Sequence, residues 1–322
     1  MVKHILVTIP TEQRHRDLLE SKVANGIFTY CAASDVTDEQ LAQSEIIIGN
    51  LPPERMKKAT SLQFLQLNSA GADNFTKAGV LPEGVKLTNA TGAYGLAISE
   101  HMLASLLMLM KKLDRYYENK QHCLWQDEGS VRSVYGSTVV ILGFGDIGQE
   151  FAKRVKALGS YVIGVRRHKG TKPEFVDEVV TTEELDDVLP RADILAMSLP
   201  NTPQTYHILN AERLAKMKKG SYLLNVGRGT SVDQDALLAA LQDGTLAGAA
   251  VDVTDPEPLP SDHPLWKAEN LFLTPHCSGA YHLQETLERI IRISAENLEH
   301  FEKNEPLRNE VDFATGYRKF PV

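Results

Sequence analysis

The stretch that decides the fold class lies at residues 139–148 and reads VVILGFGDIG. Residues 139–142 are all apolar and mostly β-branched, which is typical of a strand covered on both faces of a parallel sheet. Residues 147–158 then read as a helix. A G-x-G-x-x-G loop between a strand and a helix is the pattern that binds the pyrophosphate of a dinucleotide.

Each glycine of this loop has its own task. Gly143 permits the tight turn, Gly145 lets the backbone approach a pyrophosphate, and Gly148 lets the helix pack closely against the strand. The first helical residues, Asp146 and Ile147, offer backbone amides and the positive end of the helix dipole to the phosphates. A glycine-rich turn without a ligand is the alternative, but the flanking strand and helix favour a cofactor site.

Short apolar runs alternate with helix-like segments on both sides of this loop. Such βαβ alternation predicts parallel sheets, and the two series of runs predict two of them. The fold class is therefore α/β, with two parallel-sheet domains of Rossmann-like or flavodoxin-like type. Strands are expected at residues 4–9, 27–31, 45–49, 64–68 and 85–88 before the loop, and at 161–165, 193–198, 222–226, 249–253 and 271–274 after it.

Two longer segments read as helices. Residues 96–120 contain neither proline nor glycine and are rich in helix formers, so they are expected to form one long connecting helix. A second helix is expected at about residues 281–303. Residues 305–322 are polar, with Pro306 and Gly316, and read as an irregular tail.

Bulk properties narrow the class of protein. A length of 322 residues favours two domains, and a net charge of −8 argues against a nucleic-acid partner. The most apolar stretch, residues 102–110, is too short to span a bilayer, and residues 1–10 read as a strand without the features of a targeting segment. Three widely spaced cysteines predict neither a disulfide framework nor a metal site, so a reducing cytoplasm is expected.

The residues after the second strand of the cofactor domain bear on the choice of cofactor. An acidic residue there accepts hydrogen bonds from the adenosine ribose in NAD-binding proteins. This chain has Arg166 and Arg167, followed by His168 and Lys169. Arginine can bind a 2′-phosphate through paired charged hydrogen bonds, so NADPH is favoured and NAD remains possible. A solvated run of charges is the alternative.

Three further segments follow predicted strands of the same sheet and contain Arg228, Glu257 and His276. Loops at the carboxyl ends of such strands line the ligand crevice. Reduction of a 2-oxo acid needs an acid, which histidine can be; a neighbouring carboxylate orients that histidine and favours its protonated form. Arginine supplies a rigid fork for the substrate carboxylate. Taken singly, each residue could equally be a surface or core residue.

The sequence resembles the D-isomer-specific 2-hydroxyacid dehydrogenase family. The resemblance rests on the glycine loop, on residues 225–230 (NVGRGT), on residues 252–260 and on residues 275–279 (PHCSG), which occur in the family's order. It implies a cofactor domain inserted into a discontinuous substrate domain. The expected boundaries are residues 1–99 plus 287–322 for the substrate domain and 100–286 for the nucleotide-binding domain.

The resemblance also implies roles for single residues. Arg228 is expected to bind substrate, His276 to act as acid and base, and Glu257 to pair with His276. The loop with Ser69, Ala70 and Gly71 is expected to hold the substrate carboxylate through Ala70 and Gly71. Cofactor contacts are expected from Arg228 and His276 themselves and from Pro200, Thr205, Val226, Gly227, Asp252, Ser278 and Gly279. The family further implies a homodimer formed through residues 96–111.

Several alternatives stay open at this point. The expected activity is that of a D-2-hydroxyacid dehydrogenase working mainly as a 2-oxoacid reductase, an NAD(P)-dependent oxidoreductase. A glyoxylate or hydroxypyruvate reductase is the same chemistry with a smaller pocket, and a dinucleotide-sensing interaction protein could use the same scaffold. The physiological 2-oxo acid, the direction of the reaction and the strictness of the NADP preference are undecided. Tyr94 is expected either to touch substrate or to pack at the hinge.

Overall fold

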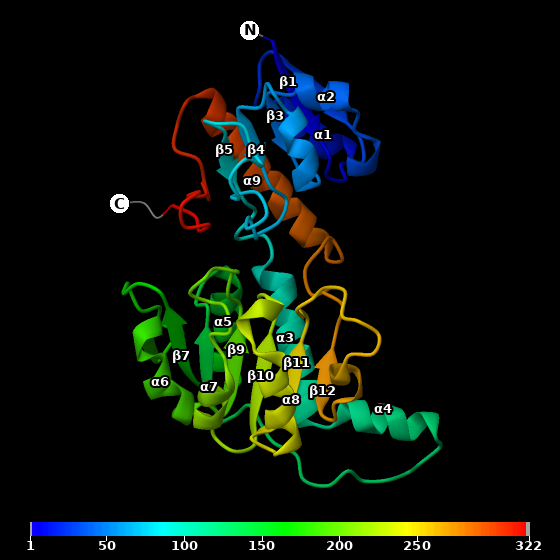
Figure 1. Cartoon of the computed structure of the whole chain (residues 1–322), viewed down its shortest axis with the longest axis vertical. Coiled ribbons are helices and arrows are strands. Elements are labelled where there is room, and N and C mark those ends of the chain that lie inside the picture. Colours follow the sequence, from blue (N-terminus) through cyan, green and yellow to red (C-terminus); the bar gives the residue numbers. More distant parts are fainter. Residues whose placement is uncertain (1, 320–322) are drawn as a thin grey trace. The chain divides into compact units, whose positions relative to one another are not determined.

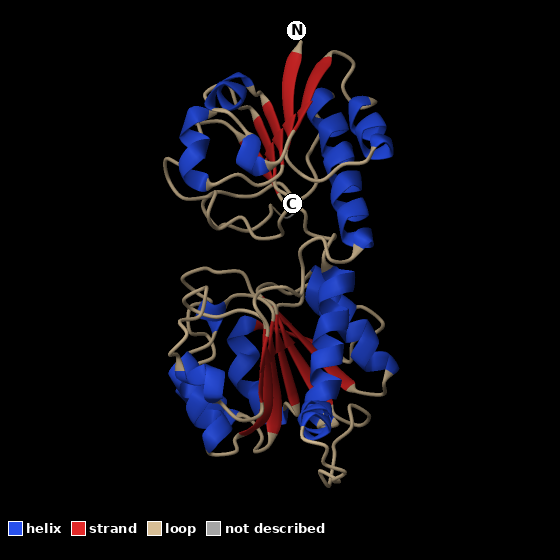
Figure 2. Ribbon diagram, turned by 90° about the vertical axis from the view of Figure 1, so that its right-hand side faces the viewer, coloured by secondary structure: helices blue, strands red, loops and turns tan. Residues whose placement is uncertain are grey.

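The chain folds into two compact units. The computed structural model describes residues 2–319 and is drawn in Figure 1. Residues 1–94 together with 281–322 make one unit, called here the split unit, and residues 95–280 make the other, called the inserted unit. The chain therefore leaves the split unit once, builds the whole inserted unit, and returns. Figure 2 shows helices on both sides of the sheet in each unit.

The split unit contains a five-stranded parallel sheet in the order β2-β1-β3-β4-β5. This order is the flavodoxin-like one, as the fold class predicted. One core cluster of this unit joins apolar residues that are distant in the chain, from Leu6 in the first strand to Val311 near the end of the chain. The elements are β1 (Lys3–Val7), α1 (Gln13–Glu20), β2 (Gly26–Tyr30), α2 (Asp38–Gln43), β3 (Ile46–Ile48), β4 (Phe64–Gln66), β5 (Lys86–Thr88) and α9 (Gln284–Glu302).

The inserted unit contains a seven-stranded parallel sheet in the order β12-β11-β10-β9-β6-β7-β8. Its first strand, β6 (Thr138–Leu142), lies between β7 and β9, so the chain order reverses beside it, as in a Rossmann fold. The other elements are α3 (Gly95–Met110), α4 (Leu113–Gln121), α5 (Asp146–Ala157), β7 (Tyr161–Arg166), β8 (Glu178–Thr181), α6 (Leu185–Val188), β9 (Ile194–Met197), α7 (Ala211–Lys216), β10 (Ser221–Asn225), α8 (Gln234–Gln242), β11 (Leu246–Val251) and β12 (Leu271–Leu273).

Burial explains why these segments form a sheet. Residues 139–142 of β6 are at most 1% exposed, and so are all four residues of β9. Central strands of this kind must be covered on both faces, which the helices shown in Figure 2 do. Because all seven strands are parallel, the loops after β6, β9, β10, β11 and β12 leave the sheet at the same edge. This edge carries most of the residues that the sequence singled out.

The expectation of one helix over residues 96–120 is wrong. The helix breaks at Lys112, whose φ of 56° lies in the left-handed region, and α4 starts directly after it. The carbonyl of Met110, the last residue of α3, is hydrogen-bonded by another segment, since it accepts from the Arg132 amide at 3.2 Å. The apolar part therefore ends as α3, and the polar part forms a separate helix.

Several bounds differ from the expected ones. The crossings between units lie at Tyr94–Gly95 and Ala280–Tyr281, a few residues before the boundaries expected from the sequence, because all of α3 packs with α5 and β11. The strand β8 was not predicted. The expected irregular tail makes two isolated β-bridges, Thr88 with Glu310 and Val311 with Arg318, and its residues 320–322 lie outside the described part. Within residues 2–319, we find no helix long and apolar enough to cross a membrane.

Candidate active site

The glycine loop follows β6, and its three glycines face different surroundings. A β-carbon at Gly143 would lie 2.8 Å from the Ser198 carbonyl oxygen, and Gly143 has a φ of 100°. A β-carbon at Gly148 would lie 2.4 Å from the Gly143 carbonyl oxygen. Apart from its chain neighbours, no heavy atom of the described residues lies within 4 Å of a β-carbon built at Gly145.

This contrast supports a ligand at the loop. Fold geometry explains the glycines at positions 143 and 148, because any side chain there would collide with the backbone. Gly145 has a φ of −94°, which any residue adopts, so neither packing nor backbone conformation requires glycine there. Space above Gly145 is what the close approach of a pyrophosphate needs. The loop therefore fits a dinucleotide.

The two residues after Gly145 begin helix α5. The Asp146 carboxylate accepts a hydrogen bond from the Gly95 amide at 3.0 Å, so this side chain binds the first turn of α3. The amides of Asp146 and Ile147 lie in the first turn of α5, where no carbonyl of the same helix can pair with them. A phosphate at this point would be bound by backbone groups.

The loop after β7 contains the cationic cluster. Arg166 is the last residue of β7, one position later than expected, and pairs with Thr181 of β8. Its Nη2 donates to the Thr171 carbonyl at 3.1 Å, whereas its buried Nε has no hydrogen-bond partner in the described structure. Arg167 and His168 are exposed and contact one another, with 2.9 Å between Arg167 Nε and His168 Nε2. No acidic residue stands at the end of this strand.

Two more loops pack together beside the glycine loop. After β9, Thr205 closes a turn by donating from Oγ1 to the Pro200 carbonyl at 2.7 Å. After β10, Val226 is buried, and a β-carbon at Gly227 would lie 2.5 Å from the Leu199 amide nitrogen. The expected cofactor residues of both loops are therefore held close to one another at the point where the strand order reverses.

Arg228 follows in the same loop after β10. The buried Asn225 shapes the turn, accepting from the Gly227 amide and donating to the Arg228 carbonyl, both at 3.0 Å. A β-carbon at Gly229 would lie 2.0 Å from the Thr254 backbone, so this loop presses directly on the loop after β11. The arginine is thereby placed beside the segment that carries Glu257.

His276 and Glu257 form a pair. The distance between His276 Nδ1 and Glu257 Oε2 is 2.8 Å, and the other carboxylate oxygen accepts from the Thr254 amide at 3.0 Å. Because a carboxylate only accepts hydrogen bonds, Nδ1 carries a hydrogen and Nε2 is left for another molecule. The imidazole is half exposed, so Nε2 is accessible to a ligand.

Asp252 anchors the loop that carries His276. Its carbonyl accepts from the His276 amide at 2.7 Å, and its carboxylate accepts from the amides of Cys277 and Ser278 at 2.9 and 3.0 Å. The Ser278 hydroxyl donates to the same carboxylate, and Gly279 follows in the loop. His276 has a φ of 51°, a left-handed conformation that is unfavourable for a non-glycine residue, and these bonds maintain it.

The expected carboxylate loop lies in the split unit, after β4. The Ser69 carbonyl accepts from the Ala90 amide, the Ala70 carbonyl from the Asn89 side chain, and the Gly71 carbonyl from Ser69 Oγ. All three carbonyls are thus bound within the unit. The nearby Tyr94 is 7% exposed; its hydroxyl donates to the Asn68 carbonyl, and burial raises its pKa.

Three supporting residues have a structural role that the sequence did not reveal. Asn225, Thr254 and Asp252 hold the turns that place Arg228, Glu257 and His276. For Asn225 and Asp252, the available signal in the sequence was a polar residue at the end of an apolar strand or directly after it. Burial, and after it the nearby Asp252 charge, raises the pKa of the Cys277 thiol, which opposes formation of a thiolate.

Comparison with known proteins gives a consistent result. The family described as D-isomer specific 2-hydroxyacid dehydrogenase, NAD binding domain, matches residues 103–278. A glyoxylate reductase of Korarchaeum cryptofilum is 34% identical over 260 residues, which are 78% of this chain and 76% of the relative.

Two solved structures are similar over almost the whole chain. A D-isomer specific 2-hydroxyacid dehydrogenase family protein from Aeromonas salmonicida has a TM-score of 0.85 and 31% identity, covering 97% of this chain and 100% of its own. An NADPH-dependent glyoxylate/hydroxypyruvate reductase of Sinorhizobium meliloti, in complex with NADP and sulfate, has a TM-score of 0.82 and 26% identity, covering 98% and 100%.

Proposed function

Because the chain belongs to the D-isomer specific 2-hydroxyacid dehydrogenase family, we propose that it works mainly as a reductase of small 2-oxo acids and prefers NADPH. The family confirms the predicted class of enzyme, an NAD(P)-dependent oxidoreductase acting on 2-hydroxy acids. The observation that carries the proposed mechanism is the pair of His276 and Glu257, 2.8 Å apart at the carboxyl edge of the sheet. The preference for NADPH and the identity of the substrate are argued separately below.

His276 is the proposed acid. With Nδ1 donating to Glu257, a protonated imidazole has one further hydrogen, on Nε2, to donate to the carbonyl oxygen of a 2-oxo acid. The bound nicotinamide supplies the hydride that reduces the carbonyl carbon. Glu257 keeps the ring in one orientation and stabilises its positive charge. In the opposite direction, neutral His276 accepts the hydroxyl proton at the same atom.

Arg228 is the proposed ligand of the substrate carboxylate. Its backbone is fixed by Asn225, and its guanidinium can form two parallel hydrogen bonds to a carboxylate. We further propose that the split unit binds substrate through the amides of Ala70 and Gly71, whose carbonyls are already bound. The inserted unit, with its glycine loop, is the proposed cofactor domain.

The preference for NADPH rests on the end of β7. No carboxylate is present there to repel a 2′-phosphate, and the exposed Arg167 follows Arg166. Either arginine can bind a phosphate through paired, charge-assisted hydrogen bonds. The test compares kcat/KM for NADPH and NADH in the parent and in an Arg166→Asp, Arg167→Ala double variant. Equal values for both cofactors in the parent would contradict the preference.

The proposed substrates are small, with glyoxylate and hydroxypyruvate first, because relatives are named for them. A kinetic screen of glyoxylate, hydroxypyruvate, pyruvate, 2-oxoisocaproate and phenylpyruvate tests this. A highest kcat/KM for one of the two large acids would overturn the choice of substrate. NADPH binding without turnover of any 2-oxo acid would favour the alternative, a dinucleotide-sensing interaction protein.

We also propose a homodimer formed through α3. This helix buries Ile98, Met102 and Leu106 within its own unit, while Leu103 and Leu107 on the opposite side stay partly exposed. A second copy would cover that apolar side. Light scattering at micromolar concentration should give twice the chain mass of 35.7 kDa, and a monomer mass would refute the dimer.

Three unpaired cysteines support a reducing, cytoplasmic location.

A further inference from the structure

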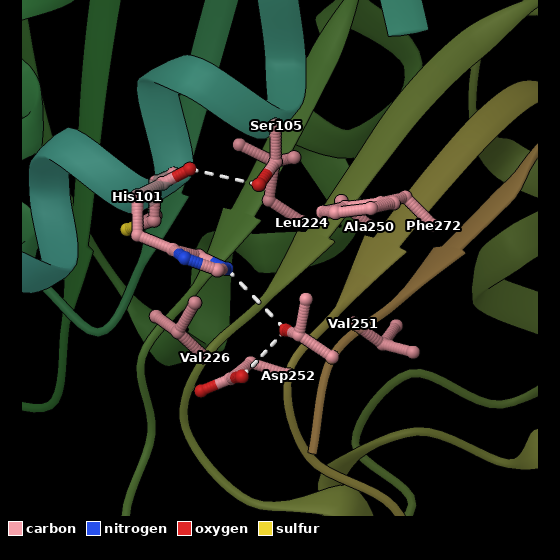
Figure 3. Close-up of a pocket in the computed structure, with 10 residues that line it drawn as sticks. His101, Ser105, Leu224, Val226, Ala250, Val251, Asp252 and Phe272 are labelled. Carbon is pink, nitrogen blue, oxygen red and sulfur yellow. Dashed lines mark hydrogen bonds between the residues drawn. The ribbon is translucent and has the colours of Figure 1, made fainter. Parts of the chain in front are cut away.

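A small cavity lies behind the loop that carries His276. Its volume is about 10 Å³, and most of its lining is apolar, between α3 and the ends of β10, β11 and β12. Figure 3 shows the His101 side chain reaching from α3 toward Asp252. The distance from His101 Nε2 to Thr274 Oγ1 is 3.4 Å, and Thr274 Oγ1 lies 2.5 Å from Asp252 Oδ1. Three polar side chains, from α3 and from the residues directly after β11 and β12, thus form a chain along one wall of the cavity.

The direction of the hydrogen bonds in this chain is fixed by donor counting. As a carboxylate, Asp252 only accepts, so the single hydroxyl hydrogen of Thr274 points to Asp252. Thr274 Oγ1 can then only accept from His101. The hydrogen of a neutral His101 ring must therefore sit on Nε2. The order of donation is His101 to Thr274 to Asp252.

Asp252 in turn determines the backbone around His276. Its two carboxylate oxygens accept from the amides of Cys277 and Ser278, and its carbonyl accepts from the amide of His276 itself. These bonds maintain the left-handed conformation of His276. A rotation of the Asp252 carboxylate would release the amides that follow the proposed acid.

We propose that His101 is a positioning residue for the reaction: by donating from Nε2 to Thr274 it fixes the rotamer of Asp252 and thereby the orientation of His276. This inference rests on the proposed function of His276. It assigns His101 a role in kcat. Substrate binding through Arg228 should not depend on it.

The variants His101→Gln and His101→Leu separate donation from packing. Glutamine offers an N–H at a similar distance from the helix, whereas leucine fills space without a donor. We expect His101→Leu to lower kcat about fivefold, the effect of one neutral hydrogen bond, with KM for the 2-oxo acid unchanged. His101→Gln should stay within about twofold of the parent on the same scale. The control is Ser105→Ala. It changes the same cavity lining, where the Ser105 hydroxyl donates to the His101 carbonyl and not to Thr274 or Asp252, and it should leave kcat unchanged.

A second readout does not depend on activity. A two-bond ¹H–¹⁵N spectrum of histidine-labelled protein identifies which ring nitrogen of His101 carries hydrogen, and Thr274→Val should alter that signal. In a double-mutant cycle, His101→Leu should add little to the kcat loss of Thr274→Val, because His101 acts through Thr274. An unprotonated Nε2 on neutral His101, equal kcat in His101→Leu and Ser105→Ala, or no rescue by glutamine would each overturn the proposal. A parent without 2-oxo acid reductase activity would refute the proposed function instead, and the spectrum would still test the hydrogen-bond chain.

Discussion

Two alanine substitutions in the glycine loop separate cofactor binding from fold stability. At Gly145 the new methyl group has no atom of the described residues within 4 Å apart from its chain neighbours, and the backbone conformation suits alanine. Loss of glycine at the N-cap of α5 lowers the free energy of unfolding, whereas the reduced flexibility of the unfolded chain raises it. We therefore expect Gly145→Ala to change the free energy of unfolding by less than about 1 kcal/mol.

The same methyl group should interfere with the cofactor. It would occupy the space above the loop through which a pyrophosphate approaches the amides of Asp146 and Ile147. We expect the Kd for NADPH to rise at least about tenfold, which is about 1.4 kcal/mol. Titration of NADPH fluorescence gives the Kd, and urea unfolding without cofactor gives the stability.

Gly148→Ala is the matched control, because its methyl group collides with the protein itself. The new carbon would lie 2.4 Å from the Gly143 carbonyl oxygen and 3.0 Å from Ile141 Cγ2. Relief of these contacts must shift α5 away from β6, so we expect a loss of about 1–3 kcal/mol in the free energy of unfolding. Unchanged NADPH affinity in Gly145→Ala, or a stability loss equal to that of Gly148→Ala, would refute the assignment of Gly145 to the cofactor.

Three further predictions follow from charged side chains. Arg228→Lys should lower kcat/KM for the 2-oxo acid at least about tenfold, since lysine lacks the planar fork, while the Kd for NADPH stays unchanged. Normal turnover would exclude the assignment of Arg228 to the substrate carboxylate. Glu257→Gln should lower reductive kcat/KM, because the carboxylate that accepts from His276 Nδ1 is lost and the ring is no longer held in one orientation. An unchanged kcat/KM would separate the two residues. Arg191 lowers the pKa of Glu178 to about 2, so this pair stabilises the fold above the ordinary carboxyl range and loses that effect as pH falls toward 2. The free energy of unfolding, measured with urea, should therefore fall less between pH 7 and pH 3 in Glu178→Gln than in the parent, by less than about 1 kcal/mol. An equal fall in both proteins would argue against the pair.

The glycine loop shows how much a local pattern can determine. Strand β6, the three glycines and helix α5 are consecutive, so the sequence contains the whole unit and the chemical reason for each position. The same holds for the parallel sheets, because strands buried on both faces are apolar throughout and recur at regular intervals. Arg228, Glu257 and His276 were predicted as site residues mainly from the family resemblance, and also because each follows such a strand and parallel strands end at one edge.

Long-range contacts decided what the sequence left open. Helix α3 ends at Met110 because the amide of Arg132, 22 residues away in the chain, pairs with its last carbonyl, and no helix breaker marks that point. The hydrogen on Nδ1 of His276 follows only from the position of Glu257. The hydrogen on Nε2 of His101 follows only from a threonine and an aspartate in the loops after two strands. Sequence patterns report which face of an element is buried and where it ends. Which donor meets which acceptor depends on the packing of loops that are distant in the chain, and tertiary structure alone determines that.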